Sequence, residues 1–193
     1  SSGEAGPPED MPRDEVKALR EAEQRAAAEV VGVEDVLFLG HRDGHLQPNL
    51  ELRRDISRVI RQVRPDVVIA QCPERRWHSI YGSHPDHLAT GEATIAAVYP
   101  DARNPHAHTE LLSEGFEPHA VSEIWVTGLE PVDVFIDITE VIELKCEALS
   151  AHSSQVGRFD VDELLRDWGT RITESNGLPE GRLTEAFRKI DAR

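Results

Sequence analysis

Two histidines and a carboxylate lie within four residues at His84-Pro85-Asp86-His87. Imidazole nitrogens and carboxylates bind metal ions and exchange protons near neutral pH. If a helix has begun here, one turn separates the two rings and places them on neighbouring positions of one face. A helix N-terminus disfavours the imidazolium form, and Asp86 could orient one ring through its far nitrogen. The spacing alone fits a metal or acid–base site about as well as a polar surface cluster.

Other residues near this stretch could contact a ligand. Asp43, between Arg42 and Gly44, is typical of a turn, or it could accept a hydrogen bond from a hydroxylated ligand. Trp77 either anchors a solvated loop or stacks on a sugar-like ring, and Tyr81 is a further candidate substrate contact. A serine nucleophile is not indicated, because the sequence has no Gly-x-Ser-x-Gly elbow.

The elements that would position these residues follow from hydrophobic periodicity and from turn residues. Asn49 and Thr139 are expected to cap helices, and Gly32 is expected to end one. We expect helices at 12–31, 49–63, 88–98 and 139–149, strands at 36–39, 67–70, 124–126 and 134–136, and weaker helical segments at 161–168 and 183–190.

Alternating helices and strands predict an α/β protein with a mostly parallel sheet. Ligands in such sheets bind outside the carboxyl ends of the strands. The loops at 41–45 and 77–87 both follow expected strands, so both are predicted to lie on that rim. The sequence therefore favours a site there.

The composition limits the classes of partner. The 193 residues carry a formal net charge of −15, which argues against nucleic acid and against an anionic membrane as partners. No apolar run is long enough to span a membrane. Cys72 and Cys146 are expected to be small apolar residues rather than a disulfide framework, so a cytoplasmic location is the expectation.

An ordered series of short motifs resembles the LmbE-like, or PIG-L, family of zinc-dependent N-deacetylases, over about residues 20–155. The motifs are Arg20-x-x-Glu23-Gln24-Arg25-Ala26-Ala27-Ala28, Gly32-Val33, Phe38-Leu39-Gly40, Asp43-Gly44, Arg64-Pro65-Asp66-Val67-Val68, His84-Pro85-Asp86-His87, Asp137-Ile138-Thr139, Lys145 and His152-x-Ser154-Gln155. The resemblance implies a Rossmann-like three-layer α/β sandwich. It also implies hydrolysis of an acetamido group on an amino sugar or a sugar-linked compound, with Zn²⁺ or another divalent metal.

The resemblance also assigns roles by position. His87 matches a zinc ligand of the family, and His84 matches the histidine that stabilises the charged tetrahedral intermediate. Asp86 matches the residue that orients this histidine, so His84 and Asp86 are the expected catalytic pair. Arg20 and Asp43 match residues that contact or shape the sugar pocket.

The sequence departs from the family at its beginning. The family opens with a strand that ends in Ala-His-Pro-Asp-Asp, which supplies two more zinc ligands and the general base, and this sequence contains no second His-Pro-Asp. We therefore expect residues 1–193 to form a single deacetylase domain that lacks the family's N-terminal strands, with a polar C-terminal extension at 156–193. A longer chain or another polypeptide would complete the site.

The sequence leaves two alternative functions open. One alternative is a non-catalytic sugar-binding or regulatory module on the same fold. The other is an amidase that acts on a thiol–sugar conjugate. The expected partner is a small N-acetylated, sugar-like molecule, and the sequence also allows a homo-oligomer.

Overall fold

The computed structural model describes residues 1–77 and 80–193, and it divides the chain into two compact units. The first unit contains Ser1–Gly44 and Phe135–Ala186, and the second contains His45–Val134 and Phe187–Arg193. Each unit has its own buried apolar cluster.

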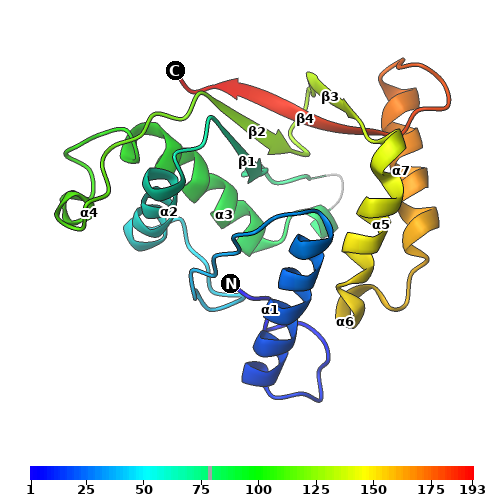
Figure 1. Ribbon diagram of the computed structural model, residues 1–193, viewed down its shortest axis with the longest axis horizontal. Helices are drawn as coiled ribbons and strands as arrows, with labels where there is room; N and C mark the ends of the chain where they lie inside the picture. Colours follow the sequence, from blue (N-terminus) through cyan, green and yellow to red (C-terminus); the bar gives the residue numbers. More distant parts are fainter. Residues whose placement is uncertain (78–79) are drawn as a thin grey trace. The chain divides into compact units, whose positions relative to one another are not determined.

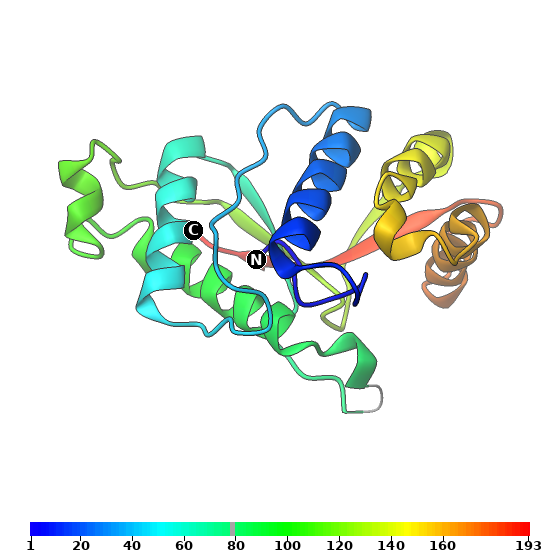
Figure 2. The same cartoon turned by 90° about the horizontal axis from the view of Figure 1, so that it is seen from below.

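The first unit is mainly helical. Its helices are α1 (Arg13–Val30), α5 (Ile142–Ser150), α6 (Ser153–Val156) and α7 (Val161–Ser175), with a short 3₁₀ turn at Thr139–Val141. Helix α5 packs against both α1 and α7, as the two views show (Figures 1 and 2). Between α5 and α7, Ile138, Ile142, Cys146, Leu165 and Leu183 form the apolar cluster.

Helix α1 ends as the sequence predicts. Gly32 has a φ of +72°, which residues with a side chain rarely adopt. Its N–H donates to the Glu29 carbonyl, and the Val33 N–H donates to the Ala28 carbonyl. This pair of hydrogen bonds is a Schellman motif, which satisfies carbonyls that the helix end would otherwise leave unpaired.

The second unit contains two neighbouring strands and the helices that pack near them. It contains α2 (Leu50–Val63), β1 (Val67–Gln71), a 3₁₀ turn (Ile80–Gly82), α3 (Pro85–Ala96), a kinked segment (Ala97–Asp101), α4 (Thr109–Ser113) and β2 (Glu123–Thr127). Helix α3 packs on β1 and on α2 (Figure 1). Asn49 caps α2 as expected, because its side chain accepts a hydrogen bond from the Leu52 N–H.

The described strands form one four-stranded sheet in the order β1-β2-β4-β3, with β3 at Val134–Asp137 and β4 at Thr184–Asp191. Strands β1 and β2 are parallel in register, with Val67 opposite Glu123 and Gln71 opposite Thr127. Strand β4 runs antiparallel to β2, so the sheet is mixed. The predicted α/β class with a mostly parallel sheet is confirmed, and β4 is the exception.

Three local predictions were wrong. Residues 36–39 form no strand, since no neighbouring strand pairs with them in the described structure. Residues 183–190, expected as a helix, belong mainly to β4, where pairing with β2 overrides the helical preference of Glu185, Ala186 and Lys189. Thr139 does not cap α5; its hydroxyl donates to Asp137 and accepts from the Leu183 N–H.

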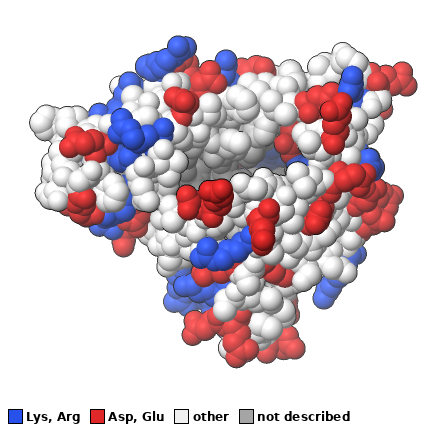
Figure 3. Space-filling model, viewed as in Figure 1, with Lys and Arg blue, Asp and Glu red and all other residues white. Residues whose placement is uncertain are grey.

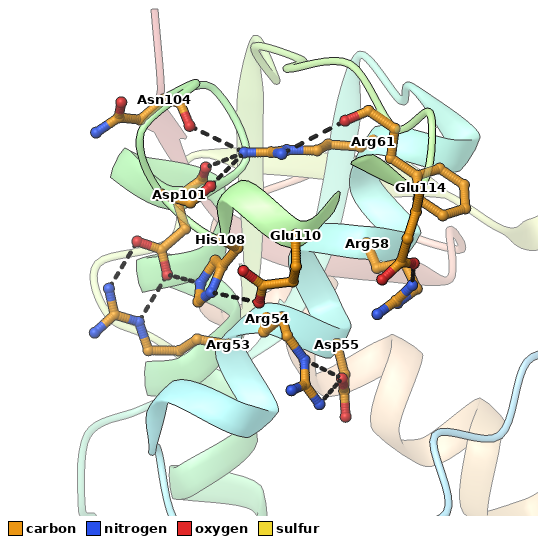
Figure 4. A network of polar contacts seen from close by, with 12 residues as sticks. Arg53, Arg54, Asp55, Arg58, Arg61, Asp101, Asn104, His108, Glu110 and Glu114 are labelled. Carbon is orange, nitrogen blue, oxygen red and sulfur yellow. Dashed lines mark hydrogen bonds and ion pairs between the residues drawn. The ribbon is translucent and has the colours of Figure 1, made fainter. Parts of the chain in front are cut away.

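The segment at 99–118 is held by hydrogen bonds from a buried arginine (Figure 4). Arg61 of α2 is 2% exposed, and its guanidinium donates to the carbonyls of Asp101, Ala102, Asn104 and Ala107. Burial lowers the pKa of Arg61 although Asp101 opposes the shift. A planar fork of donors can satisfy several carbonyls at once, which the ammonium of a lysine cannot do in the same geometry.

The surface carries charged side chains of both signs. In the face shown in Figure 3, acidic side chains are interspersed with basic ones and no large basic patch is visible. Among the described residues, no helix is both long and apolar enough to cross a membrane. Cys72 and Cys146 are both free thiols, and Cys146 belongs to the buried cluster of the first unit.

Candidate functional site

The histidine-rich stretch forms the start of helix α3. His84 is the N-cap residue, and Pro85 occupies the first helical position, where its fixed φ is suited to a helix and its missing N–H is not needed. The Asp86 N–H donates to His84 Nδ1 at 3.2 Å. An Nδ1 that accepts leaves the proton of a neutral ring on Nε2. The His84 side chain is exposed. The N–H donor of its neutral ring is Nε2, the nitrogen that the Asp86 N–H does not contact.

The two histidine rings lie close together, as the spacing predicts. Their centroids are 5.4 Å apart and their planes are tilted by 53°. His87 is also exposed, in the first turn of α3.

Asp86 is buried beside these rings and is 4% exposed. Its carboxylate accepts a hydrogen bond from the Leu46 N–H at 3.3 Å, and its carbonyl accepts from the Thr90 hydroxyl at 2.7 Å. The contact described between residues 84 and 86 uses the Asp86 main chain. Orientation of His84 by the Asp86 carboxylate stays a prediction.

A metal ion would find only part of its ligands here. Within residues 1–77 and 80–193, no group of three His, Cys, Asp or Glu side chains is arranged to hold a metal. His87 is suitable in kind, as an exposed imidazole at a helix N-terminus, but a catalytic zinc needs about three protein ligands. The described residues therefore supply one candidate ligand, His87, and not the complete set that a catalytic zinc needs.

Helix α3 reaches the carboxyl end of β1 because Gly91 has no side chain. A Cβ at Gly91 would lie 2.4 Å from the Gln71 carbonyl oxygen and 3.0 Å from the Pro73 nitrogen. This close approach joins the histidine-bearing helix to the end of the strand, where ligands of parallel sheets bind.

The loop after β1 carries Trp77, whose side chain is 86% exposed. The Arg75 guanidinium lies 6.0 Å from the centre of its ring. Such exposure leaves the indole face open to a ligand, so the predicted substrate contact remains a prediction. The Tyr81 side chain, like His78 and Ser79, lies outside the described part of the structure.

Arg20 and Asp43 belong to the first unit, where both contact the N-terminal segment. Arg20 donates to the Pro7 carbonyl at 2.8 Å, and its buried Nε has no hydrogen-bond partner. The Asp43 carboxylate accepts from the Ala5 N–H at 3.0 Å and from the Ser1 hydroxyl at 2.9 Å. Neither contact tests the role that the sequence predicts for these residues in binding substrate.

Glu23 is a buried carboxylate to which the sequence assigned no role. Its oxygens accept from the Ser154 N–H at 2.7 Å, the Ser154 hydroxyl at 2.7 Å and the Ser153 hydroxyl at 3.1 Å. Burial raises its pKa, but the hydrogen bonds from Ser154 and Ser153 outweigh burial and leave the pKa of Glu23 below its usual range. The position of Glu23 within the ordered series of family motifs was the one feature of the sequence that could have indicated its importance.

The geometry defines an α/β protein with a polar histidine site beside the carboxyl end of a parallel strand. A family model described as "PIG-L: GlcNAc-PI de-N-acetylase" matches residues 1–98. The chain is 31% identical over 174 residues to the probable N-acetyl-alpha-D-glucosaminyl L-malate deacetylase 2 of Bacillus anthracis, covering 88% of this chain and 70% of the relative. The chain therefore belongs to the PIG-L family.

Two further relatives are diacetylchitobiose deacetylases. The Thermococcus kodakarensis protein is 33% identical over 177 residues, covering 91% of this chain and 64% of the relative. The solved Pyrococcus horikoshii N,N'-diacetylchitobiose deacetylase superposes with a TM-score of 0.85 at 29% identity, covering 99% of this chain and 70% of that one. These named relatives are deacetylases, a class of amide hydrolase, and each contains sequence beyond the span that this chain matches.

Proposed function

We propose that a protein containing this chain removes the acetyl group from an N-acetylated amino sugar or sugar-linked small molecule by zinc-dependent hydrolysis. Family membership supports the reaction class, and the relatives' names support an acetylated sugar as the substrate. The single observation that carries the proposal is the His84–Asp86–His87 arrangement at the start of α3.

His84 is the residue that this geometry suits to stabilise negative charge. Hydrolysis of an amide places developing charge on the carbonyl oxygen, and a pre-oriented N–H donor lowers the free energy of that state. The Asp86 N–H holds Nδ1 as an acceptor, so Nε2–H is left as the donor of the neutral ring.

His87 would supply one metal ligand in this proposal. Zinc or another divalent ion, when bound, lowers the pKa of a coordinated water. The remaining ligands and the general base are expected outside the described residues. Arg20, Asp43, Trp77 and Tyr81 are the proposed substrate contacts.

An acetate-release assay on the full-length protein, combined with metal analysis, tests the function. His87→Ala is expected to lower both the bound zinc and the activity, because it removes a ligand. His84→Ala is expected to keep the zinc and to lower kcat by about 10²- to 10³-fold, the usual cost of losing one oxyanion donor. His106→Ala, which removes an exposed histidine elsewhere in the second unit, is the matched control. Activity that survives both chelation and His87→Ala would exclude the proposal.

A non-catalytic sugar-binding module is the second candidate. The absence of a three-ligand metal group within the described residues is the observation that favours it. Calorimetry separates the two candidates: a module binds an N-acetylated glycoside without releasing acetate, whereas the enzyme releases acetate in proportion to its zinc content.

A further inference from the structure

The loops that follow β1 and β2 are joined by one arginine. These strands are parallel neighbours, so the chain leaves both at the same edge of the sheet. Arg76, in the loop after β1, donates through Nη2 to the carbonyl of Gly128, in the loop after β2, at 2.7 Å. A charged donor with a carbonyl acceptor makes one of the stronger kinds of hydrogen bond.

Position 128 accommodates this contact only as glycine. Gly128 has a φ of +66°, and a Cβ built there would lie 2.0 Å from Arg76 Nη2. Both the backbone conformation and the space therefore depend on the missing side chain. The arginine occupies the volume that any other residue at 128 would fill.

The main chain of Arg76 is tied to the histidine site. The Ser83 hydroxyl, in a residue that is 2% exposed, accepts a hydrogen bond from the Arg76 N–H at 2.8 Å. The Ser83 N–H donates to the Ile80 carbonyl at 2.9 Å. Ser83 immediately precedes His84, the N-cap of α3. Arg76 is therefore hydrogen-bonded through its backbone to the residue before the histidine site and through its side chain to the loop after β2.

Trp77 follows Arg76 directly and has no buried anchor of its own, since it is 86% exposed. Its described ring contact is with the Arg75 guanidinium, which is itself part of the loop. The place of the indole therefore depends on how the backbone at residue 76 is held.

We propose that Arg76 is a positioning residue for substrate recognition: through Gly128 and Ser83 it fixes Trp77 relative to His84. This inference rests on the proposed function, because it takes Trp77 and His84 as the groups that meet the substrate. Arg76 itself needs no contact with the substrate. Its bonds to Gly128 and Ser83 act on the two groups that do.

The first test compares kinetic constants of the full-length enzyme. Arg76→Met removes the bond to Gly128 but keeps the length of the side chain, and it is expected to raise KM by about three- to tenfold with kcat within about twofold. Arg76→Lys keeps the charge and is expected to recover part of the loss. Arg188→Met is the matched control, because Arg188 is another arginine that donates to a loop carbonyl, that of Pro131, at 3.1 Å. Wild-type KM in Arg76→Met would overturn the inference.

A double-mutant cycle tests the contact between Arg76 and Gly128 by also changing Gly128. Gly128→Ala is expected to raise KM as Arg76→Met does, because its Cβ displaces the guanidinium. With Arg76→Met in place the collision with Nη2 is gone, so adding Gly128→Ala is expected to raise KM by less than it does in the wild-type background. Fully additive effects would count against the contact.

Fluorescence of Trp77 gives a readout that needs no activity. Residues 1–193 contain three tryptophans, so Trp125→Phe with Trp168→Phe leaves Trp77 as the sole emitter among them, and any tryptophan elsewhere in the full-length protein is replaced by Phe as well. Time-resolved anisotropy is expected to show a larger amplitude of fast local motion after Arg76→Met, and no change after Arg188→Met. Unchanged anisotropy in Arg76→Met would overturn positioning by Arg76, whereas an inactive wild-type enzyme would contradict the proposed function instead.

Discussion

Glu23 is held as a buried anion mainly by hydrogen bonds from two serines. It is 6% exposed, and its three described donors come from Ser153 and Ser154 at the start of α6. A buried carboxylate without such donors would take up a proton. The bonds therefore join α1 to α6 within the first unit and keep the charge in place.

Replacing this charge is expected to cost stability in a pH-dependent way. Glu23→Gln should lower the free energy of unfolding at pH 7 by about 2 kcal/mol, because it weakens hydrogen bonds to a charged acceptor. The pKa of Glu23 is depressed in the folded state, so its contribution is present above the unfolded value of about 4.3 and is lost as pH falls through the folded value. Denaturant titrations at pH 7 and at about pH 3 should show the difference between wild type and variant shrinking in acid.

Glu29→Gln is the control for this experiment, because Glu29 is an exposed glutamate of the same helix. It should change stability by less than about 0.5 kcal/mol at either pH. A loss for Glu23→Gln that is equal at both pH values would contradict the role of the charge.

Individual residues were predictable where the partners are close in sequence. The His84–Asp86–His87 grouping follows from spacing, and the structure confirms that the two rings are neighbours. The partners of Glu23 are 130 and 131 residues away, and local pattern carries no information about such pairs. The same limit applies to Arg76 and Gly128, which are 52 residues apart.

At the scale of elements, the contact between α3 and β1 has one critical position. Gly91→Ala would place a Cβ 2.4 Å from a backbone oxygen of Gln71, so the helix or the strand must move. Alanine favours a helix by about 1 kcal/mol over glycine. The collision should exceed that gain, with a net loss of about 1–3 kcal/mol in the free energy of unfolding.

Gly169→Ala in α7 is the comparison, because its added Cβ would meet mainly the Leu183 side chain, at 3.2 Å. A contact of 3.2 Å needs a shift of only a few tenths of an ångström, so this variant should lie closer to wild type in chemical denaturation. Equal stabilities for the two variants would show that the approach of α3 to β1 is looser than the structure indicates.

Helices were predictable where the apolar periodicity and the capping residues agree. Segments whose structure depends on hydrogen bonding to a neighbouring strand were not predictable. Helix α2 has both an Asn49 cap and helical apolar spacing, and it forms as expected. Residues 36–39 are apolar but lack a neighbouring strand in the described structure, and Leu37 is 52% exposed. Residues 184–191 carry helix-forming side chains, yet the ladder to β2 makes them a strand.

At the scale of the whole molecule, net charge is the property that the sequence determines directly. A formal charge of −15 produces a negative potential that reaches about 30 Å at ionic strengths near 0.01 M and about 8 Å near 0.15 M. The negative charge of these 193 residues should repel an anionic N-acetylated sugar conjugate, so under the proposed function kcat/KM for such a substrate is expected to rise as salt is added, roughly twofold over this range. A neutral acetylated disaccharide should show no such dependence, because screening changes only the encounter of like charges. Initial rates for both substrates across a salt series measure the effect. If kcat/KM for the anionic substrate falls as salt rises, a local basic group must dominate, and Arg75, beside Trp77, would be the first residue to replace.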